Sequence, residues 1–342
     1  MAFYCGIDLS ARESSLCIID DNQSIVFEQK MINQIDRIEH SLRPYKQELQ
    51  IVVESTFNWY WLIDGLQSAG YDVCLAHTLG LQMITGAKVK TDRRDAFALA
   101  RLLRAGMIPK AYIYPADSRA VRDLLRRRQR LVRQRAYEYG QIRQLLLRCG
   151  VIDVGRNAVK EIDDDDLPSL FDHPMLVLHA GQELARIRLY SDQLEEIEKE
   201  ILYQAEARPE FARLQKVPGI GVILGLTILY EIGEIDRFPD VRCFSSYCRL
   251  VPGVAQSGTV NRRGRASKQG NAYLKNAFSQ AAVAAVRCYP QIKRYFERHL
   301  KGQKSGKRKL VVYNIIAHKL ARAVYHILKD GESYRMELLF GQ

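Results

Sequence analysis

The chain has no pair of cysteines spaced CxxC, and its seven cysteines are scattered between positions 5 and 288. An odd and dispersed set excludes a disulfide framework and a zinc-ligand spacing, and it favours a reducing compartment. No apolar run approaches the roughly 18 residues that a membrane span requires, and the opening stretch FYCGIDLS is strand-like rather than a signal sequence. We therefore expect a cytoplasmic protein with no membrane partner.

Acidic residues are also scarce relative to basic ones. The 342 residues include 51 Lys and Arg against 39 Asp and Glu, which gives a net charge of +12. A basic excess of this size is typical of a protein that binds a polyanion, and nucleic acid is the first candidate. The hydrophobic share of 47% is that of an ordinary globular protein, and the length predicts two or three domains.

Residues 1–115 are predicted to form an α/β domain. Three short β-rich runs, FYCGIDLS, SSLCIIDD and SIVFEQK, are separated by breaks of hairpin length, and helices and strands then alternate. The order β-β-β-α-β-α-β-α describes a mixed sheet covered by helices, as in ribonuclease-H-like (RuvC-like) nuclease domains. In such a sheet the first and fourth strands are neighbours.

The remainder of the chain is predicted to be all-α. Two long stretches, 117–149 and about 176–204, carry apolar residues at helical steps of three and four, so that together they form a coiled-coil arm at 116–206. Residues 207–342 are predicted to form a helical domain that contains a Gly- and basic-rich loop, SGTVNRRGRASKQGN. The acidic run IDDDDLP between the long helices is expected to be a solvated loop.

Four carboxylates mark the ends of predicted elements in the first domain. Asp8 ends the first strand, Glu54 ends the fourth, and Asp92 and Asp95 share one face at the start of a helix. Each alone has an ordinary explanation, such as a helix cap or a turn. Because the first and fourth strands are neighbours, we expect the four to form one cluster. Grouped carboxylate oxygens suit Mg²⁺, or Mn²⁺, and two such ions can promote phosphoryl transfer.

The order of several motifs resembles that of a known family. GIDLS, VVES and KTDRRDA, followed by PGIG, QSG, a basic loop and SKQG, are similar to motifs of the DEDD transposases of bacterial insertion sequences. That group includes Piv-type DNA invertases and bridge-RNA-guided recombinases, and the resemblance covers nearly the whole chain. It implies that the family's metal-holding tetrad falls on Asp8, Glu54, Asp92 and Asp95, and its nucleophilic serine on Ser257.

The resemblance also implies the partners. They are DNA, a structured guide RNA and further copies of the chain, in a homo-oligomer that is a dimer or a tetramer. It implies a composite site as well, in which the metal-holding domain of one subunit meets the serine domain of another. DNA would then become transiently joined to the serine.

The surroundings of Ser257 fit a nucleophile. A serine that attacks a phosphodiester needs cations or a metal to hold the phosphate, and four basic residues follow within eleven positions. These residues are Arg262, Arg263, Arg265 and Lys268. No histidine is nearby in the sequence, so a carboxylate or water has to accept the proton. A plain Ser-Gly turn is the alternative, and Ser267 is a rival nucleophile that a helix N-cap also explains.

The first long helix is rich in arginine, with ten arginines against three acidic residues. A run of charge is usually a solvated face. Because this excess is of one sign and arginine favours bidentate phosphate contacts, we expect the helix to bind an RNA or DNA backbone. The expected contact residues are Arg126, Arg127, Arg128, Arg130 and Arg133.

The segment VPGIG at 217–221 resembles the hairpin of helix-hairpin-helix DNA binders, in which glycine lets backbone N–H groups approach a phosphate. A plain turn between two helices, with glycines that serve packing, explains it equally well. The sequence leaves both interpretations open.

These features together predict an insertion-sequence transposase or site-specific recombinase. The predicted reaction is a Mg²⁺-assisted attack of Ser257 on a DNA phosphodiester, which gives a covalent 5′-phosphoserine link and a free 3′-hydroxyl that rejoins to the exchanged strand. Two alternatives remain: a metal-dependent nuclease of the Holliday-junction type that uses water, and a non-catalytic nucleic-acid-binding protein.

Overall fold

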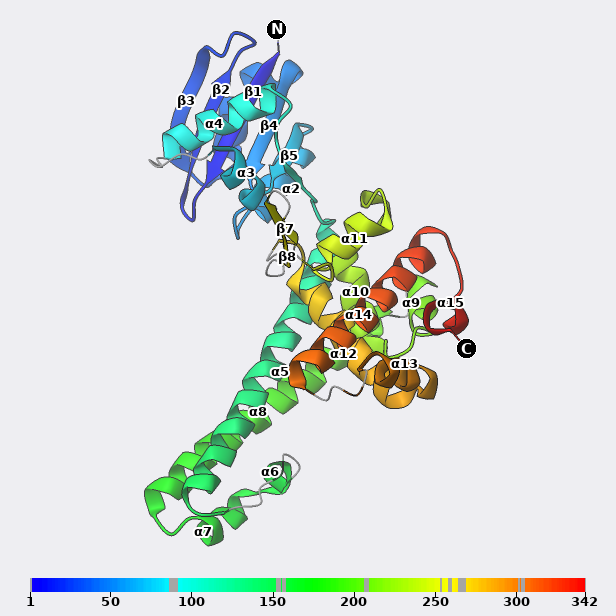
Figure 1. The fold of residues 1–342 in the computed structure, drawn as a ribbon. Coiled ribbons are helices and arrows are strands. Elements are labelled where there is room, and N and C mark those ends of the chain that lie inside the picture. The colour runs from blue at the N-terminus through cyan, green and yellow to red at the C-terminus, as the bar shows by residue number, and fades with distance from the viewer. Residues whose placement is uncertain are drawn as a thin grey trace. The chain divides into compact units, whose positions relative to one another are not determined.

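The chain divides into two compact units, Met1–Ala116 and Asp117–Gln342. The computed structural model describes residues 2–85, 92–151, 155, 158–205, 209–252, 254–257, 260–263, 269–300, 302 and 305–341. The first unit is a sheet with helices on its faces, and the second is built mainly from helices (Figure 1). The predicted coiled-coil region and the predicted C-terminal helical region belong to the same compact unit, and the expected three-part division stays a prediction.

A six-stranded mixed sheet is the centre of the first unit. Its strands are β1 Phe3–Leu9, β2 Glu13–Ile19, β3 Ile25–Ile32, β4 Leu49–Glu54, β5 Asp72–Ala76 and β6 Lys110–Ala111. They lie in the order β3-β2-β1-β4-β5-β6. β1 is antiparallel to β2 and parallel to β4, and β4 is parallel to β5. The expected contact between the first and fourth strands is confirmed, and the arrangement is consistent with a ribonuclease-H-like fold.

Helices cover both faces of this sheet because alternate side chains of each strand point to opposite sides. On one face, Ile7 of β1 and Ile51 of β4 pack with Leu62. The helices that cover this face are α1 Ile35–Leu42 and α2 Tyr60–Ser68. The other face carries α4, Asp92–Arg104, which lies across the strands (Figure 1). A short helix, α3 Thr78–Thr85, follows β5.

At Gly6, the backbone of α4 packs directly against β1. A Cβ atom on residue 6 would lie 2.0 Å from the backbone oxygen of Ala96 and 2.7 Å from the backbone nitrogen of Ala100. Main-chain atoms of a packed helix cannot give way unless the whole helix moves. Gly6→Ala should therefore displace α4 and lower the free energy of unfolding of the first unit by about 1–3 kcal/mol.

Urea unfolding would measure this loss. Gly140→Ala is the matched control, because a Cβ at that helical position meets no atom within 4 Å. Its expected effect is neutral or stabilising by up to about 1 kcal/mol. Equal stability of Gly6→Ala and the unchanged chain would contradict the close packing of α4 on β1.

Two long helices form an arm in the second unit. α5 spans Ala116–Arg148 and α8 spans Pro174–Ala205, and they lie side by side (Figure 1). Leu145 of α5 packs with Leu184 of α8 at one end, whereas Leu125 of α5 packs with Ile201 of α8 at the other, so the two helices are antiparallel. Both long helices expected from the sequence are present. The short helices between them are α6 Ala158–Glu161 and α7 Leu167–Leu170.

The other helices of the second unit share one large apolar core. They are α9 Pro209–Leu214, α10 Val222–Ile232, α11 Val241–Tyr247, α12 Ala272–Cys288, α13 Pro290–Leu300, α14 Gly306–Lys329 and α15 Met336–Phe340. Phe244, Phe278 and Leu320 are fully buried in this core. The described part of the chain contains no helix with both the length and the apolarity needed to cross a bilayer.

The basic segment expected to be a loop contains a strand, which pairs with a strand that ends at the start of that segment. β7 Val254–Ser257 pairs antiparallel with β8 Val260–Arg263. Only two residues separate the strands, the length of the tightest hairpin connection, and each strand begins with a β-branched valine. The prediction of a loop over 257–271 was therefore wrong at Ser257 and at β8, because the basic side chains obscured a short strand pattern.

Candidate active site

Asp8 and Glu54 lie at adjacent strand ends. β1 and β4 are parallel, with Ile7 opposite Val53, so the two acidic residues occupy the next position on each strand. Each is buried, with 9% of its surface exposed. Placing two carboxylates largely out of water on neighbouring strands is costly unless cations or hydrogen-bond donors compensate, and such arrangements are typical of functional sites.

Both carboxylates lie on the face of the sheet that α4 covers. Gly6 lies against the backbone of α4, and because side chains alternate along a strand, Asp8 shares the face of Gly6. On β4, Val52 packs with Leu99 of α4, and Glu54 is two residues further along the same face. The expected placement of Asp8 beside Glu54 on one face follows directly from these two strands.

The first turn of α4 lies toward the Asp8 end of β1. At the opposite end of α4, Arg104 donates from Nε to the backbone oxygen of Asp21 at 2.7 Å. Asp21 follows the end of β2, which pairs with the start of β1, so this end of α4 lies away from Asp8.

Asp95, in the first turn of α4, is half-buried. Asp92 begins α4, but its side chain lies outside the described residues. Among the described side chains, no three of the types Asp, Glu, His and Cys come close enough to surround a metal ion.

Ser257 is the last residue of β7. In the hairpin register it lies opposite Val260, and Arg262 lies opposite Ala255. The backbone therefore sets a basic strand beside the strand that ends in the serine. The side chains of Ser257, Arg262 and Arg263 lie outside the described residues. The described residues include neither the backbone nor the side chains of Arg265, Ser267 and Lys268.

Two family models match the chain. Residues 5–150, which include the carboxylates, match a DEDD domain described as a transposase, and residues 211–297, which include Ser257, match the transposase IS116/IS110/IS902 family. The chain belongs to the IS110 family of DEDD transposases. It is therefore a DNA-processing enzyme.

Curated relatives agree with this membership. A protein of Pseudomonas aeruginosa described as a family 20 transposase is 29% identical over 273 residues, which cover 76% of this chain and 80% of that protein. The transposase for insertion sequence element IS1111A of Coxiella burnetii is 26% identical over 264 residues, 72% of this chain and 68% of the relative. The transposase for IS1328 of Yersinia enterocolitica is 26% identical over 255 residues, 71% and 74% of the two chains.

The DEDD domain implies that the transposase depends on a divalent metal. The donor set fits such an ion, because Asp8, Glu54 and Asp95 offer carboxylate oxygens, two of them buried at adjacent strand ends. With Asp92 they would hold the metal. When bound, the metal would supply positive charge for the phosphate oxygens of DNA. Because Asp8 and Glu54 lie on the paired strands β1 and β4, the site is fixed on one face of the sheet.

Three arginines of the transposase that were expected to bind nucleic acid contact other helices of the second unit. Sequence analysis missed these partners because they lie on α8 and α10, far along the chain. The contacts are Arg126 Nε to Glu231 Oε1 at 2.5 Å, Arg128 Nε to Glu198 Oε1 at 2.7 Å and Arg127 Nη2 to Gln193 Oε1 at 3.4 Å. Arg130 and Arg133 are exposed, and the binding of nucleic acid by this helix stays a prediction.

The VPGIG turn of the transposase joins α9 to α10. Gly219 has φ of +77°, and a Cβ there would lie 2.1 Å from the backbone oxygen of Ala281 on α12. Val217 and Ile220 are buried in the helical core. The glycine is thus needed for the turn and for its close packing, and a phosphate contact at this turn stays a prediction.

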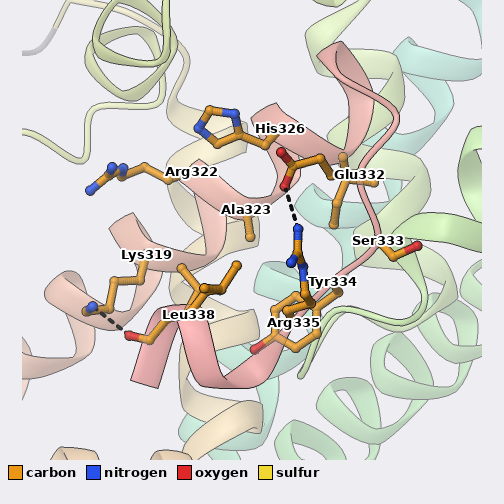
Figure 2. A pocket seen from close by; sticks show the side chains of 11 residues that line it. Lys319, Arg322, Ala323, His326, Glu332, Ser333, Tyr334, Arg335 and Leu338 are labelled. Atoms are coloured by element: carbon orange, nitrogen blue, oxygen red, sulfur yellow. Dashed lines mark hydrogen bonds and ion pairs between the residues drawn. The ribbon is translucent and has the colours of Figure 1, made fainter. Parts of the chain in front are cut away.

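The C-terminal segment of the transposase forms a pocket of about 230 Å³ between α14 and α15. Lys319 donates from Nζ to the backbone oxygen of Leu339 at 2.6 Å, and Arg335 approaches Glu332 at 3.9 Å (Figure 2). Burial and the charge of Arg322 lower the pKa of Lys319. The hydrogen bond from Lys319 to Leu339 connects α14 to α15. The residues that line the pocket include none of the candidate active site.

Glu138 of α5 and Glu183 of α8 meet inside the arm. They are 7% and 5% exposed, and Arg186 contacts both, at 3.5 Å and 2.6 Å. Burial, together with the hydrogen bond and charge of Glu183, raises the pKa of Glu138 to about 7. Burial opposes ionisation of Glu183 as well, but its hydrogen bonds with Glu138 and Arg186 hold its pKa below the ordinary value.

The Glu138 proton should make the stability of the arm depend on pH. Its pKa of about 7 in the folded chain exceeds the ordinary value of 4.5, so the stability it contributes is complete below about pH 4.5 and is lost as the pH rises to about 7. We expect the melting temperature to fall over this window and Glu138→Gln to flatten the fall. Glu196→Gln, at an exposed position of α8, is the control. Parallel melting profiles of Glu138→Gln and the unchanged chain would refute the raised pKa of Glu138.

Proposed function

We propose that this transposase cleaves and rejoins DNA with Ser257 as its nucleophile. The Oγ atom of Ser257 forms a bond to phosphorus, the bond from phosphorus to the 3′ oxygen breaks, and the hydroxyl proton ends on the leaving 3′ oxygen. The product is a 5′-phosphoserine link and a free 3′-hydroxyl. In the reverse reaction this hydroxyl attacks the phosphorus of the phosphoserine link on the exchanged strand, and the serine hydroxyl is released. Asp8, Glu54, Asp92 and Asp95 hold Mg²⁺ or Mn²⁺ for this reaction.

The observation that carries the proposal is the buried pair Asp8 and Glu54 at neighbouring strand ends, on the face covered by α4. A metal-holding function explains why two carboxylates are kept together out of water. The β7–β8 hairpin supports the second half of the proposal, because its basic strand runs beside the strand that ends in Ser257. Arg262, Arg263, Arg265 and Lys268 would hold the phosphate during attack.

Incubation with Mg²⁺ and labelled DNA that spans the ends of the element tests this function. We expect cleavage together with a protein–DNA complex that survives denaturing electrophoresis. Cleavage without such a complex would favour a nuclease that uses water. Binding without cleavage would favour a non-catalytic nucleic-acid-binding protein.

The serine and the carboxylates that act on one phosphodiester come, in this proposal, from different copies of the chain. Mixing Asp8→Asn with Ser257→Ala should then restore adduct formation, because each variant supplies the half that the other lacks. We expect recovery of about a quarter of the activity of the unchanged chain, since subunits that pair at random form a doubly intact site that often. No recovery in the mixture would contradict the composite site.

A structured guide RNA is the remaining part of the proposal. The net charge of +12 and the exposed Arg130 and Arg133 support a large nucleic-acid surface. The test is to express the transposase with its native flanking DNA, purify it at moderate salt and sequence the nucleic acid that remains bound. One dominant structured RNA encoded beside the gene is the expected result, and random fragments would contradict guidance.

A further inference from the structure

Glu231 is a buried carboxylate in an otherwise apolar helix. It lies near the end of α10 with 1% of its surface exposed. Two arginines of α5 surround it, Arg122 through Nε at 3.1 Å and Arg126 through Nε at 2.5 Å and Nη2 at 2.9 Å. Burial alone would raise the pKa of Glu231, but the hydrogen bond and charges of these arginines lower it. The carboxylate is therefore charged and fixed to the arm.

The same carboxylate also binds the first residue after the serine-bearing segment. Asn271 donates from Nδ2 to Oε2 of Glu231 at 2.7 Å. The other side-chain atom of this residue, Oδ1, accepts from the backbone nitrogens of Tyr273 at 2.8 Å and Leu274 at 3.0 Å. Asn271 is thus the N-cap of α12, and hydrogen bonds to both the nitrogen and the oxygen of its side-chain amide fix its orientation.

The backbone at this position is fixed as well. Gly270 has φ of +94°, and a Cβ there would lie 2.4 Å from the backbone oxygen of Tyr247. The Asn271 nitrogen donates to that same oxygen at 2.6 Å, and Arg249 Nε donates to the oxygen of Gly270 at 2.8 Å. The segment that contains β7, Ser257 and β8 therefore rejoins the helical core at one defined point.

We infer that Glu231 is a positioning residue for the serine reaction. Through Asn271 it fixes the end of the segment that carries Ser257, and through Arg122 and Arg126 it joins that end to the arm. This inference rests on the proposed role of Ser257. It also gives Arg126 a function different from the phosphate contact expected from the sequence, because its guanidinium belongs to this connection. Loss of the connection should slow the reaction of the serine without weakening the binding of DNA.

Asn271→Asp is the most direct test, because it keeps the cap acceptor and replaces the donor to Glu231 by a carboxylate that repels it. The rate of adduct formation at saturating DNA should fall about tenfold or more, since small misplacements of a reacting group have effects of this size. The half-saturating DNA concentration should stay within about twofold. The double variant Glu231→Gln with Asn271→Asp restores a hydrogen bond in the reverse direction, and it should recover part of the lost rate.

A second pair of variants separates the connection from general effects of charge. Arg126→Gln removes a partner of Glu231 and should lower the adduct rate. Lys199→Gln, which removes one positive charge at an exposed position of α8, is its control and should leave the adduct rate at saturating DNA unchanged. An unchanged rate in both Asn271→Asp and Arg126→Gln would overturn the inference, as would equal losses in Arg126→Gln and Lys199→Gln.

Hydrogen exchange gives a readout that does not require the adduct. The Asn271 amide, which donates to Tyr247, should exchange at least about tenfold faster in Asn271→Asp, while amides inside α12 keep their protection. Uniform loss of protection, or none, would contradict the connection. If the unchanged chain forms no adduct while this local exchange appears, the proposed serine chemistry fails and the connection through Glu231 stands.

Discussion

Ser257→Ala should abolish the covalent complex between the transposase and DNA. The hydroxyl oxygen is the atom that bonds to phosphorus, and alanine has none, so no fraction of the adduct should remain. DNA affinity should stay within about threefold, because phosphate contacts from basic residues dominate binding and a neutral hydroxyl adds little to them. Denaturing electrophoresis measures the adduct, and fluorescence anisotropy measures the affinity.

Ser267→Ala is the control for this experiment, because Ser267 is the other serine in the basic segment. It should retain the adduct and the stability of α12, because the N-cap of that helix is Asn271 and not Ser267, as the sequence had suggested. An adduct that survives in Ser257→Ala and disappears in Ser267→Ala would move the nucleophile to Ser267. An adduct in both variants would exclude both serines.

Asp8→Asn should remove metal-dependent cleavage with little change in the fold. The substitution keeps the size of the side chain but removes a charge from the buried pair, so the site attracts a divalent ion less strongly. We expect the cleavage rate to fall roughly 10²- to 10³-fold, as when other preorganised charge partners are removed from active sites. Mg²⁺ should also raise the melting temperature of the first unit in the unchanged chain and not in Asp8→Asn, because only the former binds it.

Asp72→Asn is the matched control, an exposed acid on a strand of the same sheet. It should keep both the cleavage rate and the stabilisation by Mg²⁺. If Asp8→Asn retained both properties, the carboxylates would have a structural role only. If it lost cleavage but retained the stabilisation, the metal would bind elsewhere.

The sheet of the first unit was predictable because its information is local. Alternating apolar residues fix each strand and its buried face, and the order of strands and helices leaves few topologies to consider. The elements that were missed are short. β6 has two residues, too few for a periodic pattern, and α1 ends at Leu42 because Pro44 lies in the next turn, which is a short 3₁₀ helix.

The candidate site was predictable where strand ends define it. Asp8 and Glu54 follow from parallel neighbours, and α4 follows from its amphipathic pattern. The arginines of α5 were not predictable in the same way, because a charge pattern along one helix contains no information about acids on distant helices. The one available indication was Glu231 itself, a single acid in the apolar stretch VILGLTILYEI, since a buried charge requires a partner.

Mass spectrometry of the trapped complex tests the central claim most directly. The complex formed with Mg²⁺ and labelled DNA would be digested with nuclease and protease, and the peptide that retains a nucleotide would be sequenced. The account predicts one modified peptide, with the phosphoester on Ser257. A nucleotide on any other residue, or complete cleavage of the DNA with no modified peptide, would contradict it.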